Sequence, residues 1–118
     1  MAGHMTGVTT HVLDTARGIP ARNMPVQLEL QESSGYWRPI GSSRTDDNGR
    51  CNQVVSGEKP LVAGTYRLTF DTASYHSGQG VQGLYPVVHV IFSVREGETH
   101  LHIPLLLSPF GYTTYRGT

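Results

Sequence analysis

The sequence has little of three things that would narrow its function at once: excess charge, cysteine and long apolar runs. Nine Lys and Arg balance nine Asp and Glu, so no charge excess draws the chain to nucleic acid or to an anionic membrane surface. The single cysteine, Cys51, cannot form an internal disulfide and is predicted to be a small buried residue. No apolar run reaches the roughly 18 to 20 residues that a membrane helix requires. We therefore expect no nucleic acid and no membrane among the partners.

The N-terminus also lacks a basic segment followed by an apolar one, which is the pattern of a secretory leader. We expect a cytoplasmic location, or a periplasmic one if a leader has been removed. Residues 1–4, which precede a second methionine, resemble a cloning remnant. Residues 5–118 are expected to form one domain, long enough to bury a core by packing alone.

Helical periodicity is scarce, whereas alternation of apolar and polar residues is frequent. In the run that begins at Val26, apolar side chains alternate strictly with Gln and Glu, which predicts a half-buried strand. Pro39 and Gly41 suit an edge strand or a bulge. One short helix is expected over 72–79, ended by Gly78 and Gly80. Strands are expected over 8–14, 26–31, 36–45, 50–55, 65–71, 87–94, 100–107 and 112–118. The pattern predicts an all-β fold, an antiparallel eight-stranded β-sandwich with one short helix.

Candidate chemistry is concentrated at three places: His11 in the first strand, Arg50 after a DDNG turn, and the C-terminal run HLHIPLLLSPFGYTTYRGT. Alternation in that run puts Leu101, Ile103, Leu105 and Leu107 on one face of a strand. The opposite face then carries His100 and His102. A solvated arginine and satisfied surface histidines are the structural alternative at each place.

Metal and nucleotide motifs do not account for these residues. His100 and His102 could chelate a metal together, but no third and fourth ligand follows at a recognisable spacing, so we expect no metal site. The DDNG stretch lacks the Glu that an EF-hand requires and is predicted to be a hairpin turn. Neither a nucleophile elbow nor a phosphate-binding loop occurs. Imidazole and guanidinium groups remain as the candidate catalysts.

Two separated motifs carry a resemblance to a known family. The first is His11-Val12-Leu13-Asp14, followed by Gly18, Pro20, Ala21 and Met24, and the second is HIPLLLSPFGYTTYRG near the C-terminus. Together they resemble the transthyretin-like family, over essentially the whole of residues 8–118. Within that family the chain is more similar to the hydrolases that act on 5-hydroxyisourate than to the hormone carriers. The carriers have Lys in place of His11 and lack the Tyr-Arg-Gly-hydroxyl ending found here.

The resemblance implies a transthyretin-type sandwich, a purine-derived small-molecule substrate and no cofactor. It implies catalytic roles for His11, Arg50 and His102, and a substrate-binding role for the tail Tyr115, Arg116, Gly117 and Thr118. The implied reaction is hydrolysis of 5-hydroxyisourate to 2-oxo-4-hydroxy-4-carboxy-5-ureidoimidazoline. It further implies a homotetramer, a dimer of dimers with sites between subunits.

Amide hydrolysis needs a base for water, a cation for the developing oxyanion and an acid for the leaving nitrogen. Arg50 suits oxyanion stabilisation, since its charge is permanent, and a nearby arginine also keeps histidines neutral. His11 and His102 are left to share the acid and base work, in an order that the sequence leaves open. His100 is expected to be a neighbour. Thr118 stands where the family usually has Ser; it keeps the hydroxyl, so we expect activity to persist.

Two other functions stay open from the sequence. A non-catalytic carrier of the transthyretin type would share the fold, but it needs no acid and base in its binding channel. An accessory sandwich domain that binds carbohydrate or protein would leave the two motifs without a role.

Overall fold

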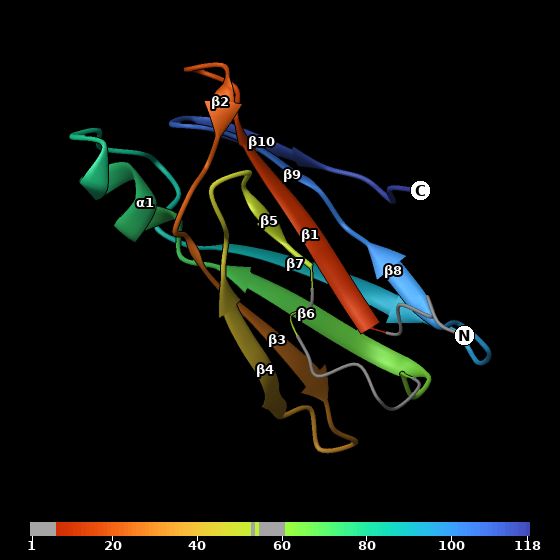
Figure 1. Ribbon diagram of the computed structural model, residues 1–118. Helices are drawn as coiled ribbons and strands as arrows, with labels where there is room; N and C mark the ends of the chain where they lie inside the picture. The colour runs from red at the N-terminus through yellow and green to blue at the C-terminus, as the bar shows by residue number, and fades with distance from the viewer. Residues whose placement is uncertain (1–6, 53, 55–60) are drawn as a thin grey trace.

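Two β-sheets pack face to face in the computed structural model, which describes residues 7–52, 54 and 61–118 (Figure 1). The six-stranded sheet has the order β10-β9-β1-β2, and β5 and β8 also pair with β1. Its strands are β1 (Gly7–Asp14), β2 (Ile19–Pro20), β5 (Arg50–Cys51), β8 (His100–His102), β9 (Leu105–Ser108) and β10 (Gly111–Thr114). The four-stranded sheet has the order β4-β3-β6-β7, with β3 (Pro25–Gln31), β4 (Trp37–Arg44), β6 (Gly64–Phe70) and β7 (Val88–Val94).

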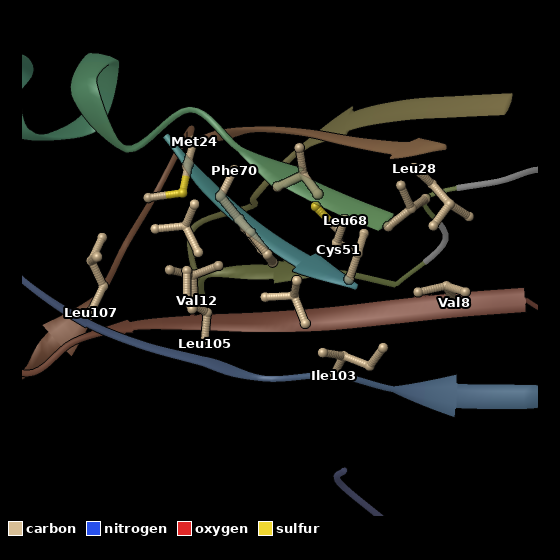
Figure 2. Close-up of a cluster of buried hydrophobic side chains, with 14 of the residues drawn as sticks. Val8, Val12, Met24, Leu28, Cys51, Leu68, Phe70, Ile103, Leu105 and Leu107 are labelled. Atoms are coloured by element: carbon tan, nitrogen blue, oxygen red, sulfur yellow. The ribbon is translucent and has the colours of Figure 1, made fainter. Parts of the chain in front are cut away.

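The core lies between the two sheets and is built from the inward halves of alternating strands. The four-stranded sheet contributes Leu28, Leu68 and Phe70, and the six-stranded sheet contributes Val12 and Leu105, all fully buried (Figure 2). Each such side chain contributes about 1.5–3 kcal/mol when it leaves water. The predicted sandwich is confirmed, and its core is apolar and continuous.

The predicted short helix is also confirmed. Helix α1 (Thr72–Gly78) lies at the end of the sandwich opposite the turn between β7 and β8 (Figure 1). Asp71 caps its N-terminus by accepting a hydrogen bond from the Ser74 backbone N–H at 3.1 Å. Tyr75 fastens the helix to the six-stranded sheet, because its hydroxyl donates to the buried carboxylate of Asp14 at 2.7 Å.

The pairing differs from the wholly antiparallel prediction at one place, where β1 runs parallel to both β8 and β9. The turn at residues 95–98 carries the chain from β7 across to the other sheet instead of back beside β7. Pro104 also divides the predicted strand 100–107 into β8 and β9, because proline has no N–H to donate to a ladder. The alternation of apolar and polar residues predicted correctly which side chains of this segment face the core. It could not predict which strand the segment pairs with.

The remaining predicted strands have counterparts with changed limits. β4 lies at a sheet edge, and the register shifts opposite Pro39 and Gly41, as those residues predicted. The strand expected over 50–55 is observed as β5, and residues 53 and 55 lie outside the described part of the chain. The last strand is β10; beyond it the chain makes one isolated bridge, between Gly117 and His102. Within the described residues, no helix is long and apolar enough to cross a membrane.

A polar cluster covers the outer face of the four-stranded sheet. The carboxylate of Glu29 accepts from Arg67 Nε and Nη2, both at 2.8 Å, and from the Thr69 hydroxyl at 2.6 Å. The guanidinium of Arg67 lies 4.5 Å from the centre of the Trp37 ring. Because the Arg67 guanidinium donates to it, the pKa of Glu29 is lowered from 4.5. This pairing explains why an outward-facing glutamate is only 7% exposed.

We predict that Glu29→Gln lowers the free energy of unfolding at pH 7 by about 1–3 kcal/mol, because Arg67 then loses a buried charged partner. A depressed carboxylate pKa stabilises the fold above its unfolded value and stops doing so as pH falls through the folded value. The difference between wild type and variant should therefore shrink below about pH 4.5, the unperturbed value. Urea denaturation at several pH values measures it. Glu32→Gln removes the exposed pair with Arg38 and is the matched control; an equal loss in both variants would contradict the prediction.

Candidate active site

The register of β1 gathers the three predicted catalytic residues on one face of the six-stranded sheet. Thr9 pairs with His102 in β8, and His11 pairs with Arg50 in β5. Side chains alternate along β1, and Thr10 packs in the core, so Thr9 and His11 belong to the opposite face. His102 also lies within electrostatic range of Arg50 and His11. The structure thus brings together groups that are separated by up to 91 positions in the sequence.

His102 is the most constrained member of this group. Its Nδ1 lies 2.8 Å from the Thr9 hydroxyl, which the β1 backbone holds in a 6% exposed position. If Nδ1–H donates to Thr9, Nε2 has a free lone pair and can accept a proton; if Thr9 donates, Nε2 carries the proton instead. The Thr9 hydroxyl therefore fixes the plane of the ring, and the direction of this one hydrogen bond sets the chemistry of Nε2.

The pKa of His102 is lowered from its ordinary value of 6.5. Burial of the ring is the largest cause, followed by the positive charge of Arg50 and then by His100 and His11. His102 is consequently neutral at neutral pH, as a general base must be. The sequence predicted the effect of Arg50, but the larger contribution comes from burial, which only the fold reveals.

His11 is held in a different way. Its Nε2 lies 2.9 Å from the backbone carbonyl oxygen of Asn48. A carbonyl can only accept, so Nε2 must carry a proton and donate it. The nitrogen of His11 that is left for chemistry is therefore Nδ1, whereas His102 keeps Nε2.

A turn is present at residues 46–49 and positions both Asn48 and Arg50, but the hairpin prediction was wrong, because β4 and β5 belong to different sheets. Asp46 Oδ1 accepts from the backbone N–H groups of Asn48 at 2.8 Å and Arg50 at 2.9 Å. These hydrogen bonds, with that of Arg50 first, lower the pKa of Asp46. Gly49 has φ 77°, and a Cβ there would lie 2.4 Å from the Val12 carbonyl oxygen, so this turn needs glycine to approach β1. The Arg50 side chain is exposed.

The C-terminal tail reaches the same group through Gly117. Its N–H donates to the His102 carbonyl at 2.8 Å, and a Cβ on Gly117 would lie 2.5 Å from His102 Cδ2. Tyr115 and Arg116 instead line a cavity of about 240 Å³ beside the edge of β7. Thr118 is exposed. The structure therefore places Gly117 on His102 itself, and the substrate-binding roles of the four tail residues stay predictions.

Three residues at this site were missed by the sequence reasoning: Thr9, Asn48 and Glu98. Thr9 was detectable, since it stands two residues before His11 and strand alternation puts both on one face. Asn48 acts through its backbone carbonyl, which its residue type does not reveal. Glu98 pairs with Arg116 across 18 positions, and no local pattern indicates that contact.

Two other residues adjoin the site. His100 Nδ1 is buried without a hydrogen-bond partner among the described residues, and His100 pairs with Gly7 beside the site. Cys51 is buried as predicted, and burial raises the pKa of its thiol, so it is poorly suited to nucleophilic chemistry. Over residues 7–52, 54 and 61–118, no three His, Cys, Asp or Glu side chains gather as metal ligands would.

We predict that Arg50→Gln raises the pKa of His102, because it removes a positive charge that disfavours the imidazolium form. An NMR titration of the imidazole signals measures this, with the His102 signal assigned by its loss in His102→Asn. Arg44→Gln, which removes an arginine bonded to Asn23 instead, should leave the His102 midpoint in place. A His102 midpoint that is equal in Arg50→Gln and wild type would contradict the electrostatic contact.

Comparison with known proteins adds to this geometry. The model of the HIUase/Transthyretin family matches residues 8–117. The 5-hydroxyisourate hydrolase of Mus musculus is 40% identical over 119 residues, which cover 100% of each chain. A crystal structure of sea bream transthyretin in complex with thyroxine superposes with a TM-score of 0.87 at 33% identity, covering 94% of each chain. The 5-hydroxyisourate hydrolase of Klebsiella pneumoniae has a TM-score of 0.81 at 30% identity, over 94% of this chain and 98% of that one.

Proposed function

Because the chain belongs to the HIUase/Transthyretin family, we propose that it is an enzyme that hydrolyses 5-hydroxyisourate, as its mouse and Klebsiella relatives are named to do. The product is 2-oxo-4-hydroxy-4-carboxy-5-ureidoimidazoline, and the reaction belongs to urate degradation. The observation that carries the proposal is the convergence of His11, Arg50 and a His102 of lowered pKa on one face. Acid, base and cation are the groups that hydrolysis of a cyclic amide requires.

In the proposed mechanism, His102 Nε2 takes a proton from water, and the water oxygen forms a bond to C6 of the substrate. The negative charge that develops on the C6 carbonyl oxygen is stabilised by the permanent charge of Arg50. The C6–N1 bond then breaks, and N1 takes up the proton held by His102, so that base and acid return to their starting states. His11 has Nδ1 left to bind a polar atom of the substrate, since Asn48 engages its Nε2.

The second candidate is a small-ligand carrier, which the superposition on the thyroxine complex of sea bream transthyretin favours. A carrier gains nothing from an imidazole that is kept neutral beside a guanidinium. Acceleration of 5-hydroxyisourate decay separates the two functions, because a carrier binds its ligand stoichiometrically and does not turn it over.

We predict that His102→Gln and Arg50→Gln each lower kcat/KM for 5-hydroxyisourate by about 10²- to 10⁴-fold, since one loses the base and the other the oxyanion cation. Loss of the ultraviolet signal of the substrate measures the rate. His89→Gln changes an imidazole on the outer face of the other sheet, where it bonds Thr69, and is the matched control. Near-normal rates in His102→Gln or Arg50→Gln would overturn the assignment. In wild type, kcat/KM should rise with pH through a midpoint below 6.5 and then level off.

We further propose that the protein is a homotetramer, a dimer of dimers whose subunits cover the site. Two features support this. The Arg50 face is open to solvent in the single chain, and large apolar side chains are exposed at the sheet edges and turns, such as Ile91 (59%) and Phe110 (74%).

The expected result in solution is a species of four chains, measured by light scattering and sedimentation at working concentrations. Phe110→Ser should shift the population toward smaller species and lower the specific activity with it, because it removes apolar area from an interface. Thr113→Ala, a change of small polar area on the same hairpin, is the control. A fully active monomer would contradict the shared site.

A further inference from the structure

The tail after β10 is attached at two points that flank β8. The Gly117 N–H donates to the His102 carbonyl at 2.8 Å, at the end of β8. The Arg116 Nη2 lies 2.9 Å from Glu98 Oε2, two residues before β8 begins. The Glu98 side chain is 17% exposed, whereas that of Arg116 is 67% exposed. The carboxylate is therefore the fixed partner, and the arginine reaches to it from the tail.

The close contact between Gly117 and His102 leaves no room for a side chain at residue 117. A Cβ on this residue would lie 2.5 Å from His102 Cδ2, so the tail backbone itself covers the edge of the imidazole. A single backbone hydrogen bond holds the end of a chain weakly, and chain ends are poorly ordered unless a second contact fixes them. The ion pair supplies that second attachment, one residue away.

We propose that Glu98 is a positioning residue, which through its ion pair with Arg116 keeps Gly117 against His102. The Glu98 carboxylate is bonded to Arg116, so Glu98 acts on the site through the tail. The inference rests on the proposed function and gives Arg116 a role in anchoring the tail rather than in binding the substrate.

The first test is a double-mutant cycle on kcat/KM for 5-hydroxyisourate, with Glu98→Gln, Arg116→Gln and the double variant. Each single change should lower kcat/KM about two- to fivefold, as loss of an ion pair with one exposed partner does. The double variant should fall no further than the single ones, because the two side chains act as one unit. Glu96→Gln alters an exposed acid in the same turn and should match wild type.

Two results would overturn the proposal. A rate for Glu98→Gln equal to wild type would show that the ion pair does not position the tail. A loss in Arg116→Gln far larger than in Glu98→Gln, multiplying in the double variant, would show that Arg116 acts on the substrate directly.

The second test measures the position of the tail and does not depend on catalytic activity. Burial is the main cause that lowers the pKa of His102, and the charged or titratable groups around the ring are Arg50, His100 and His11. In Glu98→Gln a loosened tail lets water reach the ring, so the NMR midpoint of His102 should rise toward its ordinary value, while Glu96→Gln leaves it unchanged. An unchanged midpoint in Glu98→Gln would count against positioning. The NMR titration can be interpreted even if the wild-type protein does not hydrolyse 5-hydroxyisourate. Failure of the proposed function and failure of the proposed role of Glu98 can therefore be told apart.

Discussion

The structure depends above all on the backbone pairing of β1, which bonds to four other strands. β8 and then β9 run parallel to one side of it, while β5 and β2 run antiparallel to the other. Each pairing fixes the register of a segment that is remote in sequence. A shift of one residue in any register would turn that segment's side chains to the opposite face. The relative positions of His11, Arg50 and His102 therefore follow from main-chain hydrogen bonds and need no direct contact among the three side chains.

Alternate side chains of β1 face the core and the candidate active site. Val8, Thr10 and Val12 belong to the core, and the residues between them belong to the site. Thr10 shows how strict this division is, because its hydroxyl donates to the Ile103 carbonyl at 2.5 Å, inside the sandwich. The neighbouring Thr9 uses the same hydroxyl to orient His102. Two adjacent threonines thus face the core and the candidate site, and only their place in the alternation distinguishes them.

The faces of the strands could be predicted from the sequence, but their partners could not. Alternation identified Leu101, Ile103, Leu105 and Leu107 as core residues, since a period of two is a local property. Parallel pairing with β1 depends on where the turn at residues 95–98 sends the chain, which is a question of global packing. For the same reason the sequence indicated His11, Arg50 and His102 as separate candidates, and their proximity came from family resemblance. Thr9, Asn48 and Glu98 act through contacts across the fold, so their residue types alone did not identify them.

The two histidines are unequal because their partners differ in kind. The partner of His11 is a carbonyl, which can only accept, so the His11 tautomer is determined by the backbone of Asn48. The partner of His102 is a hydroxyl, which can donate or accept, so either ring nitrogen of neutral His102 can carry the proton. Burial and the charge of Arg50 favour its neutral form between turnovers. In the proposed mechanism, proton transfer is therefore assigned to His102, because its lowered pKa leaves Nε2 free to accept a proton, and His11 is assigned to holding the substrate.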